Sequence, residues 1–502
     1  MAFYITTSIS YVNGQPHLGH AYEAIATDII ARHHRQRGEE TFFLTGTDEH
    51  GEPVADSARA NGMEPRAWAD LNAAKFQALL PVLDVAPDFF IRTTDPEHTR
   101  RVQAVLQRVY DNGYVHKGVY EGWYCPRCAD FKVENEILEG NRCPIHEISL
   151  TREHEENYFF QLSAFQERLE AWFADHPDFV APARAKNEAE AFLAGGLQDV
   201  SLSRAKLNWG VAVPWDPSHV FYVWFDALLN YYTAPGFARP GSDLTAMLWP
   251  ADVHMIGKDI LKFHTIFWPA MLMAAGLEPP RRVFVHGHLA AADGRKMSKS
   301  LGNGIDPMEV VQEFGGPDPL RFYLMRDVRY GSDGPVGRES LTARYNAELA
   351  NDYGNLASRT LAMITRYRAG DVPAVGTDPE LRADFDELEE QVAAALARID
   401  ISGALDLVWQ RVRRLNRYVE ERRPWELARE PTATGQLDSV LASLHEGVRV
   451  VSVLLWPYIP GSAQRVLAAL GRPSLELTGF AATSAGVTVE SIPPLFPTLA
   501  PV

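Results

Sequence analysis

Cysteine is scarce in this sequence of 502 residues: there are three, all between positions 125 and 143. Three thiols in one short stretch do not form a disulfide framework, so we expect a reducing compartment. Long hydrophobic runs are also missing. The longest, residues 266–277, is too short to span a bilayer, and the N-terminus has no basic region followed by an apolar one. These absences exclude a disulfide-rich secreted domain and a transmembrane protein, and they predict a soluble, cytoplasmic protein.

Positive charge is also in short supply, with 48 Lys and Arg against 65 Asp and Glu and a net charge of -17. An acidic balance normally argues against a nucleic-acid partner. The argument is weak here, because a local basic face on an acidic protein can still bind a phosphate backbone. The 46% hydrophobic content, with 11 Trp and 24 Phe, is that of a folded protein. At roughly 100 to 200 residues per domain, the length predicts three or four domains.

Strand and helix patterns alternate from residue 1 to about 117. The strand-like runs are residues 3–9, 41–45 and 89–92, and the helical patterns are residues 18–37, 68–80 and 98–112. Such alternation predicts a parallel sheet covered by helices, with ligands at the carboxyl ends of the strands. Asp48 falls at one such end, where it could hold a cationic amino group. As part of a bare turn it would be unremarkable.

A His-Leu-Gly-His run at residues 17–20 lies where the first strand pattern passes through a turn into a helix. His17 and His20 are therefore expected at a helix N-terminus, where backbone NH groups and the helix dipole favour an anion. Gly19 leaves room for a flat group against the backbone. Taken alone, the two histidines could equally be a metal pair or surface residues.

Residues 287–303 form a loop with two lysines three positions apart, Lys296 and Lys299, with Ser298 between them and glycines on both sides. Lysine is a compact charge on a flexible stem, and a Ser hydroxyl can bond a phosphate oxygen. The pattern suits a mobile arm that brings cations to a phosphate. The alternative is a solvated basic loop.

The cysteines stand in two pairs, Cys125 with Cys128 and Cys143 with His146, the second closing with the histidine. Three thiolates and one imidazole can hold a tetrahedral zinc ion. We expect a closed structural site rather than a catalytic zinc, since no position is left open. A redox Cys-x-x-Cys would leave Cys143 and His146 unexplained.

Residues 151–290 return to strand and helix alternation. If the run around Gly257 begins as a strand and continues as a helix, Phe263, His264 and Phe267 lie near one another on helical turns. Aromatic residues at this spacing are more often core than pocket. Asp259 could accept hydrogen bonds from a ribose diol or cap the helix.

From about residue 345 the strand pattern disappears, and helical patterns at residues 349–366, 381–399, 405–421 and 437–455 predict a helical bundle. One face looks basic, with Arg411, Arg413, Arg414, Arg417, Arg422 and Arg423. Arginine beside an exposed Trp425 suits single-stranded RNA. A solvated helix with Trp425 buried is the alternative. The Pro-rich tail from Ser491 is expected to pack loosely.

Residues 17–20 and the Lys-Met-Ser-Lys-Ser run at 296–300 resemble the two signature motifs of class I aminoacyl-tRNA synthetases. Together with the cysteine cluster, Trp224 and Tyr231, residues 257–259, Asn355 to Arg359 and residues 423–425, they resemble the methionyl-tRNA synthetase family over nearly the whole chain. The resemblance implies an α/β fold. Its expected parts are a Rossmann-type catalytic domain (1–117 and 201–290), a connective insertion (118–200) with a zinc knuckle (122–150), a stem-contact region (291–345) and an all-α helical-bundle anticodon-binding domain (346–502).

The implied reaction joins methionine and Mg-ATP into methionyl-adenylate, then passes the methionyl group to the terminal adenosine of tRNA(Met). In this family His17, His20, Lys296 and Lys299 would stabilise charge on the phosphates, an electrostatic task without a protein nucleophile. ATP would also contact Gly19, Asp259 and Ser298, and Mg²⁺ would accompany it. Asp48 would hold the methionine ammonium. The side-chain pocket would be Ile9, Tyr11, Trp224, Leu228, Tyr231, Phe263, His264 and Phe267, with Leu228 replacing a proline of some relatives.

The resemblance also implies that Asn355, Arg359 and Trp425 read the CAU anticodon, and that Cys125, Cys128, Cys143 and His146 hold one structural zinc ion. Without an appended C-terminal module, we expect a monomer.

Other class I synthetases and a small nucleotidyltransferase remain alternatives. Isoleucine, leucine and valine enzymes carry a large editing insertion, because one methylene is worth only about 1 to 3 kcal/mol. This chain has no room for one. A cysteinyl enzyme would disperse its zinc ligands along the core. A nucleotidyltransferase of the same superfamily binds no RNA and does not need the helical region after residue 345.

Overall fold

A computed structural model describes residues 2–126, 130–132, 137–145, 147–295, 304–480 and 486–500. The chain forms two compact units. The first consists of Met1–Pro16, Glu40–Pro81 and Ala86–His286, and the second of His17–Glu39, Val82–Val85 and Gly287–Val502. The domain boundaries expected from the sequence remain predictions. In the described part of the chain, no helix is both long enough and apolar enough to cross a membrane.

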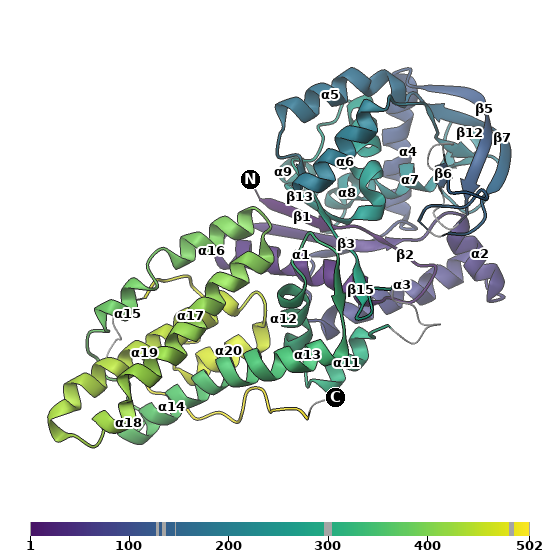
Figure 1. Cartoon of the computed structure of the whole chain (residues 1–502). Helices are drawn as coiled ribbons and strands as arrows, with labels where there is room; N and C mark the ends of the chain where they lie inside the picture. Colours follow the sequence, from purple (N-terminus) through teal and green to yellow (C-terminus); the bar gives the residue numbers. More distant parts are fainter. Residues whose placement is uncertain are drawn as a thin grey trace. The chain divides into compact units, whose positions relative to one another are not determined.

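The first unit contains a parallel sheet in the order β2-β3-β1-β13-β14-β8, with β4 also paired to β3 (Figure 1). Its strands are β1 (Phe3–Thr7), β2 (Ser10–Tyr11), β3 (Thr41–Asp48), β4 (Phe89–Arg92), β8 (Val180–Ala181), β13 (Val253–Gly257) and β14 (Val283–His286). Every residue of β3, β13 and β14 is buried, as expected for strands with both faces covered. The predicted α/β architecture with a parallel sheet is confirmed.

Helices of the first unit connect these strands; most of them contribute to one large apolar core, while α2 and α3 form a smaller cluster with Val12. They are α2 (Glu52–Ala60), α3 (Pro65–Val82), α4 (Pro96–Asp111), α5 (Gln166–Asp175), α6 (Ala183–Ala194), α7 (Val223–Ala227), α8 (Asn230–Thr233), α9 (Thr245–Leu248) and α10 (Trp268–Ala274). A π-helix, Phe263–Phe267, leads into α10. The segment after Gly257 is therefore helical, as predicted.

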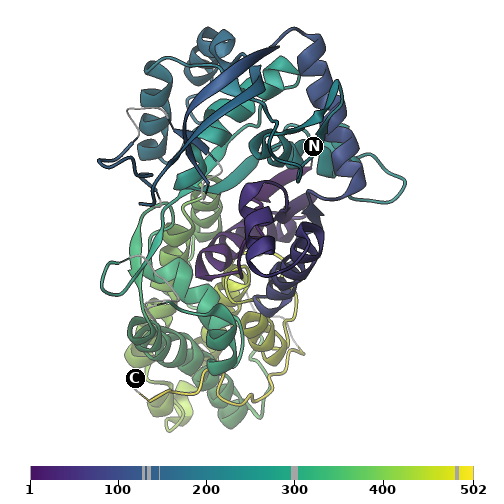
Figure 2. The ribbon, with the colours of Figure 1, turned by 90° about the vertical axis from the view of Figure 1, so that its right-hand side faces the viewer.

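Strands and helices alternate again from residue 151, as predicted, in the order β7 (Thr151–Phe160), α5, β8, α6 and β9 (Val200–Ser201), but β7 and β9 do not join the parallel sheet. Strands β6 (Asp130–Lys132), β5 (Val115–Cys125), β7 and β9 form an antiparallel sheet in that order. The long blue strands β5 and β7 run side by side in Figure 2. Along the middle of each strand, exposed residues alternate with less exposed ones, which suits an antiparallel ribbon with one wet face. A second antiparallel sheet contains β10 (Ser203–Arg204), β12 (Asp216–Phe221) and β11 (Ala212–Val213).

The second unit is mainly helical, as predicted for the C-terminal part. Its helices are α1 (Leu18–Gln36), α11 (Pro307–Glu313), α12 (Asp318–Asp327), α13 (Arg338–Arg344), α14 (Asn355–Arg368), α15 (Pro379–Ala383), α16 (Leu388–Ala397), α17 (Ile401–Arg422), α18 (Pro424–Leu427), α19 (Thr434–Leu455) and α20 (Pro460–Ala469), and a π-helix, Tyr345–Gly354, precedes α14. Strands β15 (Leu289–Ala291) and β16 (Gly334–Val336) pair with each other. Apolar residues at helical spacing bury one face of α17.

The Pro-rich tail does not pack loosely, contrary to expectation. Tyr345 donates its hydroxyl to the carbonyl of Pro497 at 2.9 Å. Asn346 exchanges two hydrogen bonds with the backbone of Leu499, and Phe496 is buried. The described tail residues are thus held by the π-helix Tyr345–Gly354 through directional bonds that composition does not reveal.

Arg321 of α12 is a fully buried charge of the second unit. Its guanidinium donates to Asp28 of α1 at 2.7 Å. It also donates to four backbone carbonyls, those of Leu83, Asp84, Pro457 and Tyr458. All five of its N–H groups are therefore used, which is the condition under which a buried guanidinium is tolerated.

We expect Arg321→Met to lower the free energy of unfolding by about 3 to 5 kcal/mol, because Asp28 and four carbonyls lose a buried donor. Urea denaturation followed by tryptophan fluorescence measures the loss. Arg329→Ala is the matched control: Arg329 is 74% exposed and pairs with Asp400 at 3.5 Å, so its loss costs at most about 1 kcal/mol. Equal effects of the two substitutions would contradict this account of Arg321.

Candidate active site

His17 and His20 stand at the N-terminus of α1 and cap it reciprocally. Nδ1 of His17 accepts the backbone N–H of Gly19 at 3.1 Å, and Nδ1 of His20 accepts that of His17 at 3.0 Å. Because Nδ1 is an acceptor in both rings, the proton of each neutral imidazole is on Nε2. The rings lie 3.8 Å apart between centroids. The geometry therefore presents two Nε2 donors at a helix N-terminus, an arrangement suited to an anion.

Gly19 lies close to the His17 ring. A Cβ at this position would come within 3.0 Å of Cε1 of His17. Glycine at this position thus allows the His17 side chain to fold back over the first turn.

The predicted aromatic pocket residues come together in the core of the first unit. The rings of Trp224 and Phe263 are stacked at 3.7 Å with an interplanar angle of 6°. Phe267 meets Phe263 edge-on at 5.2 Å, and Tyr11 meets Trp224 edge-on at 6.3 Å. Leu228 is buried in the same core, and Ile9 packs against it. Phe263 and Phe267 are four positions apart in the π-helix Phe263–Phe267, which brings their rings into contact.

Tyr231 and His264 form a buried polar pair within this core. Nδ1 of His264 bonds the carbonyl of Ile260 at 3.0 Å, so it carries the proton and donates. Burial lowers the pKa of His264 to about 4, so the ring is neutral and Nε2 accepts the hydroxyl of Tyr231 at 2.8 Å. The hydroxyl proton of Tyr231 and the Nδ1 proton of His264 are both hydrogen-bonded to protein acceptors. The pair offers a ligand a polarizable surface rather than a charge.

Asp48, the last residue of β3, is only 3% exposed. Burial raises its pKa well above the usual range, the charge of Asp226 raises it further, and the backbone N–H of His50 opposes the shift. No residue in the described ranges donates a hydrogen bond to its Oδ1. Likewise, no described acceptor receives the buried indole N–H of Trp224. Such unsatisfied buried groups are features of a site that expects a polar ligand.

A histidine–aspartate–histidine network near Asp48 was missed by the sequence reasoning. Asp226 of α7 accepts Nδ1 of His50 at 2.6 Å and Nε2 of His98 at 3.0 Å, and Nδ1 of His98 bonds Thr233 at 2.7 Å. Burial would raise the pKa of Asp226, but the two histidines outweigh it and hold the pKa at about 2. The partners are 176 and 128 positions away in sequence. The only sign of this network in the sequence is that His50 stands two residues after Asp48.

Asp259 is exposed in the short turn Lys258–Ile260 after β13. Gly257 occupies the N-cap position and makes no side-chain cap, so Asp259 is not the N-cap of this turn. A Cβ on Gly257 would approach Oδ1 of Asp259 to 2.8 Å. Glycine therefore leaves room for that carboxylate. Lys296, Ser298 and Lys299 lie outside the described residues.

Cys125 and Cys143 are both fully buried in one small cluster with Leu150. Cys128 and His146 lie outside the described residues. Within the described ranges, no three His, Cys, Asp or Glu residues are grouped to hold a metal. Two buried thiols side by side nevertheless fit half of a zinc site better than an apolar core, because thiolates are preferred zinc ligands.

The three predicted anticodon residues lie together in the second unit. Asn355 is exposed at the start of α14, and Arg359 follows one turn later on the same helix. The guanidinium of Arg359 lies 5.9 Å from the ring centroid of Trp425 and bonds Glu420 at 2.9 Å. Trp425 is half-buried, which lies between the exposed ring and the buried ring that the sequence left open.

Arginines of α17 gather on one face, as predicted, but most of them are paired with acceptors of the protein. Arg414 pairs with Asp384 and Glu421, Arg422 with Asp378 and Glu380, Arg423 with Glu426, and Arg413 with Glu348 and Asp352. Arg411 donates to the carbonyl of Asp384 at 2.6 Å. A hollow of about 490 Å³, lined by Arg411, Arg413, Arg414, Arg417, Asp384, Ala383 and Gln410, lies on this face. Carboxylates from neighbouring elements neutralise most of the arginines.

Comparison with known proteins places the chain in a family. The sequence profile described as tRNA synthetases class I (M) matches residues 3–153 and 132–361. The methionine–tRNA ligase of Streptomyces coelicolor is 44% identical, over 99% of this chain and 97% of that one. That of Rhizobium meliloti is 42% identical, over 99% and 98%.

The fold resembles that of Mycobacterium tuberculosis methionyl-tRNA synthetase in complex with methionyl-adenylate, with a TM-score of 0.95, 40% identity and coverage of 99% of this chain and 100% of that one. The chain therefore belongs to the methionyl-tRNA synthetase family of class I tRNA synthetases.

Proposed function

We propose that this chain activates methionine with ATP, forming methionyl-adenylate and pyrophosphate, and transfers the methionyl group to the 3′-terminal adenosine of tRNA(Met). The observation that carries the proposal is the buried Oδ1 of Asp48, which accepts no hydrogen bond from the described residues and whose residue pairs in the sheet with Tyr11 of the aromatic pocket. A buried carboxylate without a cation is unfavourable, and an α-ammonium group supplies that cation. The combination of one anionic group and an aromatic wall matches an apolar amino acid.

Methionine is recognised through its thioether. Trp224, Phe263 and Phe267 supply aromatic surface, and sulfur to ring contacts contribute about 0.3 to 1.5 kcal/mol each. Because Tyr231 and His264 donate their protons to protein acceptors, an apolar side chain leaves neither of these two donors unsatisfied. Ile9, Tyr11 and Leu228 complete the predicted wall. A charged side chain would find no counter-charge among these residues.

Adenylate formation is an in-line displacement in which the methionine carboxylate attacks the α-phosphorus and pyrophosphate leaves. Nε2 donors of His17 and His20 stabilise the charge that develops on the phosphate oxygens. Lys296, Lys299 and Ser298 are proposed to complete that task, with Gly19 and Asp259 at the nucleoside and Mg²⁺ on the ATP phosphates. No protein nucleophile is required.

Asn355, Arg359 and Trp425 are proposed to read the anticodon, through hydrogen bonds from the first two and base stacking on the third. Cys125, Cys128, Cys143 and His146 are proposed to hold one structural zinc, which would tie the connective strands together. A monomeric state and a cytoplasmic location remain predictions.

The experiment that tests the proposed function is ATP–pyrophosphate exchange with each of the twenty amino acids in the absence of tRNA. Methionine alone is expected to drive exchange. If a different amino acid drives it, the pocket assignment is wrong. If none does, the chain does not activate amino acids in this way.

Asp48→Asn is expected to lower kcat/KM for methionine in pyrophosphate exchange by about 10- to 100-fold, because a hydrogen bond to a charged group is worth about 1.5 to 3 kcal/mol. Asp56→Asn serves as the matched control, since Asp56 pairs only with exposed Arg59 at 2.8 Å in the structure as described. A kcat/KM for Asp48→Asn within twofold of the unsubstituted protein would exclude the ammonium role.

Trp425→Ala is expected to leave pyrophosphate exchange unchanged and to lower kcat/KM for tRNA in aminoacylation by about 10- to 100-fold, because stacking of one base contributes about 1 to 3 kcal/mol. Exchange by the same preparation controls for folding. Unchanged aminoacylation would remove Trp425 from the anticodon site.

A further inference from the structure

The segment directly before the predicted anticodon residues is a ten-residue π-helix, Tyr345–Gly354. It continues without a break into α14, whose first residue is Asn355. π-Helices are rare and occur mostly as single turns at functional sites. Because a π-helix closes its hydrogen bonds between residues i and i+5, it winds more slowly than an α-helix. Its length therefore determines the direction in which every later residue of α14 points.

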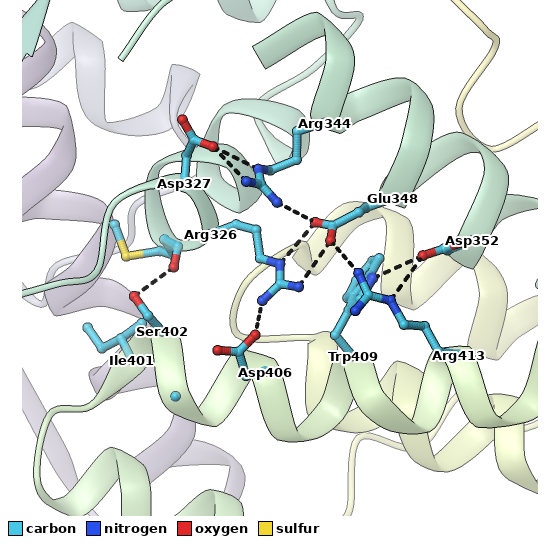
Figure 3. Close-up of polar contacts among 12 residues, drawn as sticks. Arg326, Asp327, Arg344, Glu348, Asp352, Ile401, Ser402, Asp406, Trp409 and Arg413 are labelled. Atoms are coloured by element: carbon cyan, nitrogen blue, oxygen red, sulfur yellow. Dashed lines mark hydrogen bonds and ion pairs between the residues drawn. The ribbon is translucent and has the colours of Figure 1, made fainter. Parts of the chain in front are cut away.

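Glu348, in the middle of this π-helix, is only 5% exposed and lies at the centre of an arginine cluster (Figure 3). Arg326 of α12 donates to it twice, from Nε at 2.9 Å and from Nη2 at 3.0 Å. Arg344 of α13 donates at 3.1 Å and Arg413 of α17 at 3.0 Å. Burial would raise the pKa of Glu348, but Arg326 and Arg344 outweigh it and lower the pKa. One carboxylate thus ties the π-helix to α12 and α17, and to Arg344 in the turn that precedes it.

Further contacts hold the next turn of the π-helix in the same orientation. Asp352 accepts the indole N–H of Trp409 at 3.3 Å and lies 3.7 Å from Nε of Arg413 (Figure 3). Its carbonyl accepts the amide of Asn416 at 3.0 Å. Tyr353 shares a hydrogen bond of 2.8 Å with Ser452 of α19. The π-helix is therefore fixed on several sides, with Glu348 making the greatest number of these charged bonds.

We propose that Glu348 is a positioning residue that sets the rotation of α14 about its axis, and so the direction in which Asn355 and Arg359 face the RNA. This inference rests on the proposed function, because it concerns how that same anticodon site is oriented. Glu348 has no contact with substrate in this scheme. It acts through the helix register, and its loss relaxes the choice between correct and incorrect anticodons.

The test uses Glu348→Gln in the full-length protein, which keeps the size of the side chain and removes its charge. Aminoacylation is measured with tRNA(Met) and with the same tRNA carrying an altered anticodon, and pyrophosphate exchange is measured without tRNA. We expect kcat/KM for tRNA(Met) to fall about 10-fold, mainly through KM, and discrimination between the two tRNAs to shrink by a similar factor. Exchange should stay within twofold.

A double-mutant cycle with Arg359→Ala separates positioning from general damage. If Glu348 acts through the face of α14, its substitution costs little once Arg359 is absent, so the two effects are not additive. Asp406→Asn is the matched control. Its carboxylate bonds the same Arg326 from an exposed position and contacts no described residue of the π-helix; we expect values within twofold of the unsubstituted protein.

Additive effects in the cycle, or an equal loss of exchange and aminoacylation, would overturn the proposal. If Glu348→Gln does not fold, Arg413→Gln replaces it. Arg413 is 55% exposed and contacts both Glu348 and Asp352, so a smaller loss with the same non-additivity is expected, and additivity would again refute the role. If the proposed function itself is wrong, the result is different: the unsubstituted protein shows no methionine-dependent pyrophosphate exchange.

Discussion

The helical unit depends on the satisfied burial of Arg321. Its guanidinium joins α12 to Asp28 of α1, which lies 293 positions earlier, and to carbonyls of residues 83–84 and 457–458. Buried ion pairs contribute little net stability, but removing one partner is costly, so they favour one arrangement over near alternatives. Arg321 therefore holds both α1, whose N-terminus His17 and His20 cap, and the C-terminal helices. Placement of the capping histidines is a property of the whole unit.

Two buried carboxyl groups with different partners shape the pocket of the first unit. Asp48 and Asp226 are both buried, and each raises the cost of ionising the other. Asp226 is supplied with two histidines, which keep it ionised, while Asp48 retains an oxygen without a donor among the described residues. The environments push the two pKa values apart. Asp48, the carboxyl group without a cationic partner among the described residues, is the one that an incoming ammonium can pair with, so the ligand supplies a charge that the described part of the protein does not.

The sequence predicted the local elements well and the distant contacts poorly. Strands β1, β3 and β4 and helices α1 and α4 follow from hydrophobic periodicity, which depends on neighbouring residues alone. The antiparallel pairing of β5 with β7 and the bonds of Asp226 to His50 and His98 depend on residues far apart in the chain. The π-helix before Asn355 is only ten residues long, too short for its apolar spacing to be distinguished from that of an α-helix. The sequence indicated the arginines of α17 but not their pairing with Asp384, Asp378 and Glu348, because these carboxylates come from other parts of the chain.

Charge pairing on α17 has a consequence for how this unit meets RNA. A surface whose arginines are already paired gains less from phosphate contacts than an unpaired one, so bulk charge contributes little to selection. Selectivity then depends on stacking and directional bonds, which Trp425 and Arg359 can supply. Arg359 is held by Glu420, a carboxylate that is 61% exposed. When an RNA group takes the guanidinium, water solvates the released carboxylate at small cost. The ion pair thus keeps Arg359 oriented before binding without opposing its transfer to the ligand.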